Sequence, residues 1–260
     1  MIVFQQIRNA TVKLKYPGGT FMIDPWLMDA CDPIERERAV AARRFIPKPV
    51  CPLPAPAGAL TGDVDWFLLT HFHPDHFSAD HLPADAPLVC QSEADAGELA
   101  GLGFSDVRWF HNGPMRFGDV TVHRVEARHG NNEETAAAMG PGSGFVFECP
   151  GEKTVYVAGD TVYYDGVRAV IERFKPDVIV VNACDARWKR GRLIMNAEDV
   201  MKTCACAPES LVIASHMEAV SHAHLSRKQL REALTGSPYA GQVRIPADGE
   251  SIELRTNKAY

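Results

Sequence analysis

Apolar residues recur along the chain in two patterns, short runs typical of strands and longer stretches with helical spacing. Three strands are predicted near the N-terminus, at 2–7, 11–16 and 20–24, with residues 17–19 as the turn before the third. Strand and helix signals then alternate, without a repeat of roughly 20 to 50 residues. This order predicts one layered α/β domain over residues 1–260, with two sheets covered by helices on their outer faces. The further strands are predicted at 65–70, 87–91, 107–110, 119–130, 144–149, 153–160, 177–183, 211–216, 243–246 and 251–254, and the helices at 92–102, 166–174, 197–206 and 226–234.

One segment interrupts this pattern. Residues 28–62 carry six prolines and a charged run, ERERAVAARR at 35–44, for which one short helix is predicted. A loop of this length inside a compact domain is usually functional or disordered. Two interpretations stay open: a solvated surface excursion, or a lid or subunit contact over the active site.

The composition is that of an ordinary globular protein, with 46% hydrophobic and 23% charged residues. The net charge of −6 disfavours nucleic-acid binding as the main task, because that affinity comes mostly from cations that neutralise phosphates, although a locally basic cleft is not excluded. No leader-like N-terminus or long apolar run supports export or a membrane span. Seven cysteines without a C-x-x-C pair suit reduced thiols, so we expect a cytoplasmic protein, and Cys204 and Cys206 are interpreted as ordinary thiols.

The most informative segment is THFHPDHF at 70–77, which contains the pattern H-x-H-x-D-H. A chain with only ten histidines rarely contains this pattern by chance. His71 and His73 lie two residues apart at a strand end, so both imidazoles point to one side and can bind one cation. Asp75 and His76 follow a turn with proline and can face a second cation. Imidazole is the commonest metal ligand near neutral pH, so a metal site is favoured over polar residues placed for solubility.

Two cations need more ligands than one motif supplies. His129, Asp160 and His216 each end an apolar strand, where a side chain on a rigid element can project into a shared cleft. Asp160 can bridge, since one carboxylate offers an oxygen to each of two cations. His222 and His224 follow His216 closely, and either could bind metal, contact substrate, act as the acid for the leaving group or cap a helix. His216 is preferred as the ligand because it ends a strand.

In this order the residues resemble the metallo-β-lactamase fold superfamily, whose members carry an aspartate on an early strand, H-x-H-x-D-H, then a lone histidine, a lone aspartate and a final histidine. Asp24 takes the first of these places. The segments IDPWL, AGDTVYYDGV and SHMEAVSHAHLSRKQLREAL are most similar to the branch with the L-ascorbate-6-phosphate lactonases and related metal-dependent hydrolases. The resemblance implies a four-layer αβ/βα sandwich with metals at one edge between the sheets, and usually hydrolysis.

The resemblance also implies two divalent metal ions, with Asp24 orienting the loop that binds them. The implied ligands are His71, His73 and His129 for one ion and Asp75, His76 and His216 for the other, with Asp160 between the two. Such ions lower the pKa of a shared water from about 15.7 toward 7 and polarise a carbonyl or phosphoryl oxygen. Asp75 is the expected catalytic residue, which would orient this water or accept its proton. The ligand types favour zinc, while manganese, iron and nickel stay open.

We therefore expect a hydrolase for a small ester, lactone or phosphorylated metabolite. Alternatives are a metal-dependent nuclease or phosphodiesterase, an iron-using redox enzyme of the same fold, and a binding protein that has lost catalysis. A Lys/Arg stripe beside the metals would favour a nuclease, whereas the complete ligand set argues against the last two. No nucleic acid or membrane partner is expected, and a homo-oligomer stays open. Five further residues lie on segments near the predicted ligands and could either contact substrate or simply pack: Trp26, Glu133, Glu134, Arg187 and Trp188. Three other histidines are expected at the surface or in packed positions: His81, His111 and His123.

Overall fold

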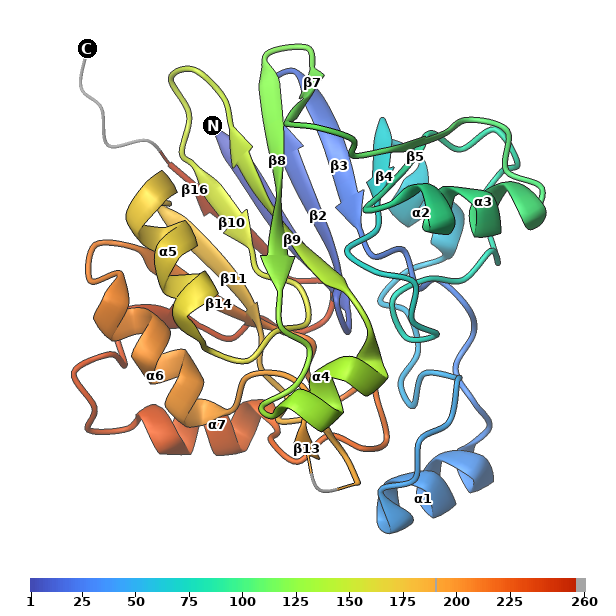
Figure 1. Cartoon of the computed structure of the whole chain (residues 1–260). Helices are drawn as coiled ribbons and strands as arrows, with labels where there is room; N and C mark the ends of the chain where they lie inside the picture. The colour runs from blue at the N-terminus through green and yellow to red at the C-terminus, as the bar shows by residue number, and fades with distance from the viewer. Residues whose placement is uncertain (190, 256–260) are drawn as a thin grey trace.

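Two seven-stranded sheets dominate the computed structural model, which describes residues 1–189 and 191–255 (Figure 1). The first sheet has the spatial order β16 (Ser251–Leu254), β1 (Ile2–Arg8), β2 (Thr11–Tyr16), β3 (Gly19–Ile23), β4 (Trp66–Leu68), β5 (Leu88–Cys90) and β6 (Val107–Trp109). The second has the order β15 (Val243–Arg244), β14 (Leu211–Ser215), β11 (Val178–Asn182), β10 (Val155–Val157), β9 (Gly142–Glu148), β8 (Val120–Ala127) and β7 (Met115–Phe117). A separate hairpin joins β12 (Arg187–Trp188) to β13 (Gly191–Arg192).

Strand direction brings several strand ends to one edge of the molecule. In the first sheet, β3 to β6 run parallel to one another. In the second sheet, β10, β11 and β14 run parallel, and β8 runs in the same direction because β9 is antiparallel to both β8 and β10. The arrowheads of β3 and β8 point to the same side in Figure 1. Residues that follow these strands therefore meet at a common edge.

The described chain has seven helices. They are α1 (Pro33–Ala42), α2 (Ala57–Thr61), α3 (Glu93–Gly101), α4 (Glu133–Met139), α5 (Asp165–Phe174), α6 (Ala197–Cys206) and α7 (Arg227–Leu234). Of these, α1 projects from the body in Figure 1 and the others cover the sheets or lie at their edge. Side-chain caps fix several helix starts: Asn196 accepts from the Asp199 amide at α6, and Ser226 forms a capping box with Gln229 at α7.

The hydrophobic core is split into layers by the sheets. One cluster lies between the sheets and includes Phe21 and Phe147. A second packs the second sheet against α5, α6 and α7, through side chains such as Ile171 and Leu230. A third packs the first sheet against α2 and α3, through Leu60 and others. Helix, sheet, sheet and helix thus form four layers, and the predicted fold class is confirmed. The assignment of residues 1–260 to one domain stays a prediction.

The proline-rich segment 28–62 contains two short helices, α1 and α2, and not only the one predicted. The helix predicted from the charged run at 35–44 is found two residues earlier, because Asp32 caps it and Pro33 begins it. The buried Arg8 guanidinium donates to the carbonyl oxygens of Trp26, Met28 and Cys51 at 2.7–3.1 Å, which ties the start of the segment and a point further along it to the first sheet. No helix within residues 1–189 and 191–255 combines the length and apolar character of a membrane span.

Candidate metal centre

The predicted ligands follow strands that end at the common edge. The segment 71–76 follows β4, His129 follows β8, Asp160 follows β10 and His216 follows β14. Tight backbone geometry sets these positions: Gly159 has φ +66°, and a Cβ there would lie 2.2 Å from the Ser143 carbonyl oxygen. Only glycine fits this approach, which directs Asp160 into the centre.

Three histidines form the first half of the centre. The ligand atoms of His71, His73 and His129 all lie within 4.8 Å of one another, and His71 Nε2 is 3.0 Å from His73 Nδ1. Tetrahedral zinc with Zn–N bonds of about 2.0–2.1 Å holds its nitrogens roughly 3.3 Å apart. The spacing therefore suits a cation held by this triplet.

Asp75, His76 and His216 form the second half, again with ligand atoms within 4.8 Å of one another. His216 Nε2 lies 3.3 Å from Asp75 Oδ2. All three side chains are buried, so their charges interact in a medium of low dielectric constant.

Asp160 joins the two halves. Its Oδ2 lies 3.3 Å from His129 Nε2 and 3.2 Å from His76 Nε2, and its Oδ1 lies 3.8 Å from His216 Nε2. The Asn182 amide donates to Oδ1 at 2.6 Å and fixes the carboxylate. The structure thus brings together all seven residues predicted as ligands, and their role in metal binding stays a prediction.

In each of three ligand histidines, the ring nitrogen that points away from the centre contacts a group outside the ligand set. His73 Nε2 donates to the Met139 carbonyl at 3.0 Å, and His129 Nδ1 to that of Leu193 at 3.1 Å. His216 Nδ1 contacts the Cys184 thiol at 3.6 Å. When the outer nitrogen of a ring carries the proton, the inner nitrogen is left with a lone pair, which is the form a metal binds.

Asp24 connects two further rings. The Thr70 hydroxyl donates to Asp24 Oδ2 at 2.8 Å and therefore accepts from His71 Nδ1 at 3.0 Å, while His76 Nδ1 donates to the same carboxylate at 2.8 Å. The Thr70 amide donates to Oδ1. Asp24 has φ +51°, a strained conformation for a residue other than glycine. Asp24 thus lies behind the predicted ligands, and its role in orienting them stays a prediction.

The electrostatics of the centre differ between its two halves. Burial alone lowers the pKa of a histidine, and it lowers those of His71, His73 and His129. Burial also acts on His76, but the carboxylates of Asp160, Asp24 and Asp75 outweigh it and raise the pKa of His76 to about 10. Without metal, the second half therefore holds protons where a cation would bind.

The surroundings of one buried nitrogen indicate that the residues fit a cation. His76 Nε2 is enclosed and has no hydrogen-bond partner among the described residues, although Asp160 Oδ2 is near. A buried polar nitrogen in this state costs free energy unless something binds it. Together with the opposed lone pairs of His71 and His73, it shows that the residues present fit divalent cations.

The structure separates His222 from His224. The His222 ring packs edge-to-face on Phe45, with centroids 5.5 Å apart, and burial lowers its pKa although the carboxylates of Asp75 and Asp160 act in the opposite direction. His224 Nδ1 instead lies 2.6 Å from an Arg43 guanidinium nitrogen. Of the two, His222 is electrostatically coupled to Asp75 and Asp160, whereas the charges acting on His224 are Arg43, Arg187 and Asp185. The substrate or acid role of either stays a prediction.

The remaining candidates have ordinary surroundings. Trp26 is fully buried beside Arg8, and Arg187 pairs with Asp185. Trp188 stacks under Lys189, and Glu133 is exposed. The three other histidines lie at the surface or in partly exposed contacts: His81 near Asp29, His111 against Trp109, and His123 paired with Glu148.

Several residues that support the centre were not found from the sequence. Thr70, Asn182 and Cys184 hold ligands, and Asn9 donates to the Asp75 carbonyl at 3.0 Å. Thr70 adjoins the motif and Asn182 ends an apolar strand, so their positions in the sequence could have indicated that they lie near the ligands. Met139 and Leu193 act through backbone carbonyls, which side-chain identity does not reveal.

Comparison with known proteins agrees with this geometry. The family model for the beta-lactamase superfamily domain matches residues 20–217. The chain belongs to the beta-lactamase superfamily. Within the superfamily, it is 36% identical to UPF0173 protein YddR of Bacillus subtilis (strain 168) over 95% of this chain and 97% of the relative. It is 29% identical to a UPF0173 metal-dependent hydrolase of Methanosphaerula palustris, over 76% of this chain and 88% of the relative.

Among solved structures, this superfamily member is similar to an isothiocyanate hydrolase from Delia radicum gut bacteria. The TM-score is 0.86 at 33% identity, over 98% of this chain and all of that one. The superfamily resemblance seen in the sequence is confirmed, while the narrower likeness to ascorbate-phosphate lactonases stays a prediction.

Proposed function

We propose that the protein is a hydrolase that holds two divalent metal ions and uses water to attack a small electrophilic substrate. The observation that carries this proposal is the Asp160 carboxylate, which contacts imidazoles from both triplets. One triplet would hold each ion, with Asp160 between them. Bound ions of this kind supply a water of lowered pKa and a polarised substrate.

The chain's own residues would orient the water and accept its proton. Burial tends to raise the pKa of Asp75, but His76 and His216 outweigh it and hold the pKa well below its usual range. Asp75 is therefore ionised at neutral pH and can orient the water or accept its proton. Asn9 holds the backbone of Asp75 by donating to its carbonyl, and His216 holds the carboxylate at Oδ2.

For the substrate we propose an isothiocyanate, supported by the 33% identity to an isothiocyanate hydrolase over nearly the whole chain. Water oxygen would bond to the central carbon, the carbon–nitrogen bond would break, and nitrogen would take up two protons, which releases an amine and carbonyl sulfide. Small esters, lactones and phosphorylated metabolites are the second candidate, which rests on the predicted likeness of the segments around the ligands to the lactonase branch.

The test compares these substrates on protein purified without chelator. We expect two metal equivalents per chain and loss of benzyl isothiocyanate with release of benzylamine. Gluconolactone and bis(p-nitrophenyl) phosphate serve as the lactone and phosphodiester arms. Turnover of the lactone alone would reject the isothiocyanate assignment, and chains with no bound metal after incubation with zinc or manganese would reject the metal centre.

Asp75→Asn should abolish turnover while removing at most part of the metal, because the amide cannot accept a proton from water. The loss should be at least about 100-fold in kcat. Asp106→Asn is the matched control, since this partly exposed carboxylate pairs with the partly exposed Arg108 at the start of β6, the strand end away from the centre. Undiminished turnover in the Asp75 variant would show that the mechanism is wrong.

A further inference from the structure

A cavity of about 540 Å³ lies beside the candidate metal centre. Its lining includes the end of β8 and the residues after it, from Arg124 to the predicted ligand His129, together with residues 140–142 and Gln91, which follows β5. Sites for small molecules usually have volumes of roughly 300–1,000 Å³. Because His129 belongs both to this lining and to the first half of the centre, a molecule in the cavity lies next to the centre.

The charge of this cavity is positive, although the chain as a whole has a net charge of −6. Arg124 and Arg128 both line it, and among the described residues Glu126 is the only acidic one in the lining. The Arg128 guanidinium lies 3.8 Å from Glu133, but that carboxylate is fully exposed, and an exposed pair of this kind contributes little. The cavity therefore offers two cations against one anion.

Buried hydrogen bonds fix one side of the Arg124 guanidinium. Arg124 Nη1 donates to the Ser143 hydroxyl at 3.1 Å, and this hydroxyl donates to Gln91 Oε1 at 2.7 Å. The Gln91 amide donates in turn to the Pro141 carbonyl at 3.1 Å. Ser143 and Gln91 are both buried, and the Ser143 backbone amide donates to the Thr70 carbonyl at 3.0 Å. The same residues therefore support Arg124 and adjoin the segment that carries the predicted ligands.

The other side of the same guanidinium is free. Arg124 Nε and Nη2 form no hydrogen bond or ion pair within the described part of the chain, where the Ser143 contact uses Nη1 alone. Nε and Nη2 form the planar fork through which an arginine binds a carboxylate by two parallel hydrogen bonds. A sulfonate presents its oxygens in a similar way. An arginine that is held on one side and free on the other, in the lining of a cavity, is arranged to bind an anion.

We propose that this cavity binds the substrate of the centre and that Arg124 pairs with an anionic group on that substrate, a carboxylate or a sulfonate, with Arg128 as a second cation. The inference rests on the proposed hydrolase and narrows its substrates to those that carry such a group away from the reacting carbon. Neutral isothiocyanates still react, with a higher KM. Arg124 binds the substrate and takes no part in bond breaking, so its loss raises KM and leaves kcat nearly unchanged.

Two substrates that differ in charge test this pairing. 4-Sulfophenyl isothiocyanate is an anion, and 4-(methylsulfonyl)phenyl isothiocyanate is a neutral counterpart with a similar electron-withdrawing group. On metal-loaded wild-type protein we expect a KM about 10-fold lower for the sulfonate, because a hydrogen bond between charged groups contributes about that much. Arg124→Gln should remove most of this difference by raising the KM of the sulfonate alone. Glu126→Gln removes the opposing charge and should lower the KM of the sulfonate further.

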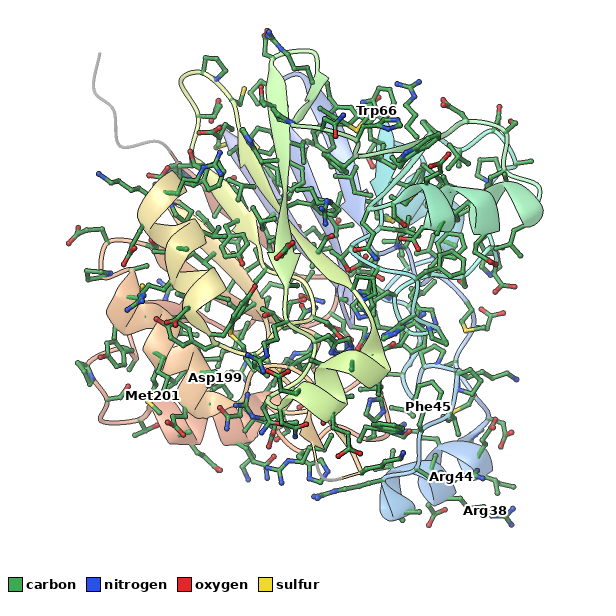
Figure 2. The ribbon with its side chains drawn as sticks, viewed as in Figure 1. Arg38, Arg44, Phe45, Trp66, Asp199 and Met201 are labelled. Atoms are coloured by element: carbon green, nitrogen blue, oxygen red, sulfur yellow. The ribbon has the colours of Figure 1, made fainter. Side chains whose placement is uncertain are left out.

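Arg108→Gln is the matched control and should keep the wild-type preference. The Arg108 guanidinium lies 4.8 Å from the centre of the Trp66 ring, and Figure 2 shows Trp66 at the end of the fold away from α4, whose Ala136 lines the cavity. Unchanged kcat on the neutral compound shows that each variant is folded.

Equal KM values of the wild type for the two compounds would overturn the inference, and so would a preference that survives in Arg124→Gln. If the wild type turns over neither compound, the proposed substrate is wrong, and binding then decides on the cavity. In isothermal titration of metal-loaded protein, benzenesulfonate should bind at least about 10-fold more tightly than the neutral methyl phenyl sulfone, and Arg124→Gln should lose this difference. Equal binding of benzenesulfonate by wild type and variant would show that Arg124 does not hold the anion.

Discussion

Asp24 accepts hydrogen bonds from the Thr70 amide, the Thr70 hydroxyl and His76 Nδ1. Each carboxylate oxygen is used, and one aspartate therefore sets the orientation of His76 directly and of His71 through the hydroxyl. Orientation by such partners changes how well a ring binds metal, because both the ring plane and the tautomer are fixed before the ion arrives.

Asp24→Asn should therefore weaken metal binding without altering any ligand. An amide has one oxygen for the three donors and brings an NH₂ group against one of them. We expect zinc affinity to fall roughly 10- to 100-fold, measured by competition with a coloured chelator. Thr70→Ser keeps the hydroxyl and should stay close to wild type. Equal affinity in wild type and the Asp24 variant would show that this carboxylate does not position the ligands.

At the scale of elements, periodicity predicted the long, buried pieces best. The helix at 197–206 has the predicted bounds, those at 166–174 and 226–234 shift by one residue at one end, and the helix at 92–102 is one residue shorter at each end. The strand predicted at 119–130 ends at Ala127, since a turn with Gly130 at φ +153° brings the chain back against α4. Helix α4 was missed because only Thr135 among its seven residues is buried, which leaves little hydrophobic pattern to read.

The β12–β13 hairpin was also missed, because two residues in each strand are too few to show a hydrophobic pattern. Both elements lie beside the centre: the carbonyl of Met139, at the end of α4, holds His73, and that of Leu193, after β13, holds His129. The ligands could be predicted from residue type and strand ends, whereas these supports depend on backbone positions that only the fold defines.

A glycine between β10 and Asp160 offers a test at this scale. Gly159→Ala adds a Cβ at φ +66° and 2.2 Å from the Ser143 carbonyl oxygen, so the strand end must shift. We expect a loss of about 2 kcal/mol or more in the free energy of unfolding, from urea denaturation. Gly18→Ala, with open space around its Cβ, should change stability by less than about 1 kcal/mol. If both variants unfold at the same urea concentration, the close approach at Gly159 does not constrain the turn.

At the scale of the whole molecule, the centre exists because two sheets present strand ends to one edge. Ligands separated by up to 145 positions in sequence, from His71 to His216, meet within 4.8 Å of their neighbours. Concentrating three carboxylates and five imidazoles there costs stability unless protons or cations balance the charge. In the metal-free protein, protons on His76 and His216 balance part of this charge, because the pKa of His76 is raised to about 10 and that of His216 is also raised.

This balance predicts how metal-free and metal-loaded protein differ with pH. A histidine whose folded pKa is raised contributes stability that is fully present below its unfolded value near 6.5 and is lost as pH rises toward the folded value. Metal-free protein should therefore lose stability between pH 7 and about 10, by roughly 1 kcal/mol per pH unit for His76. Zinc replaces these protons, so loaded protein should not suffer this loss, and zinc should bind more tightly as pH rises.

Thermal unfolding of both forms measures the effect: the gap between their Tm values should widen from pH 7 to 9.5. Buried cysteines and tyrosines titrate alike in both forms and cancel in the difference, so a constant gap would mean that His76 and His216 hold no protons for a metal to displace.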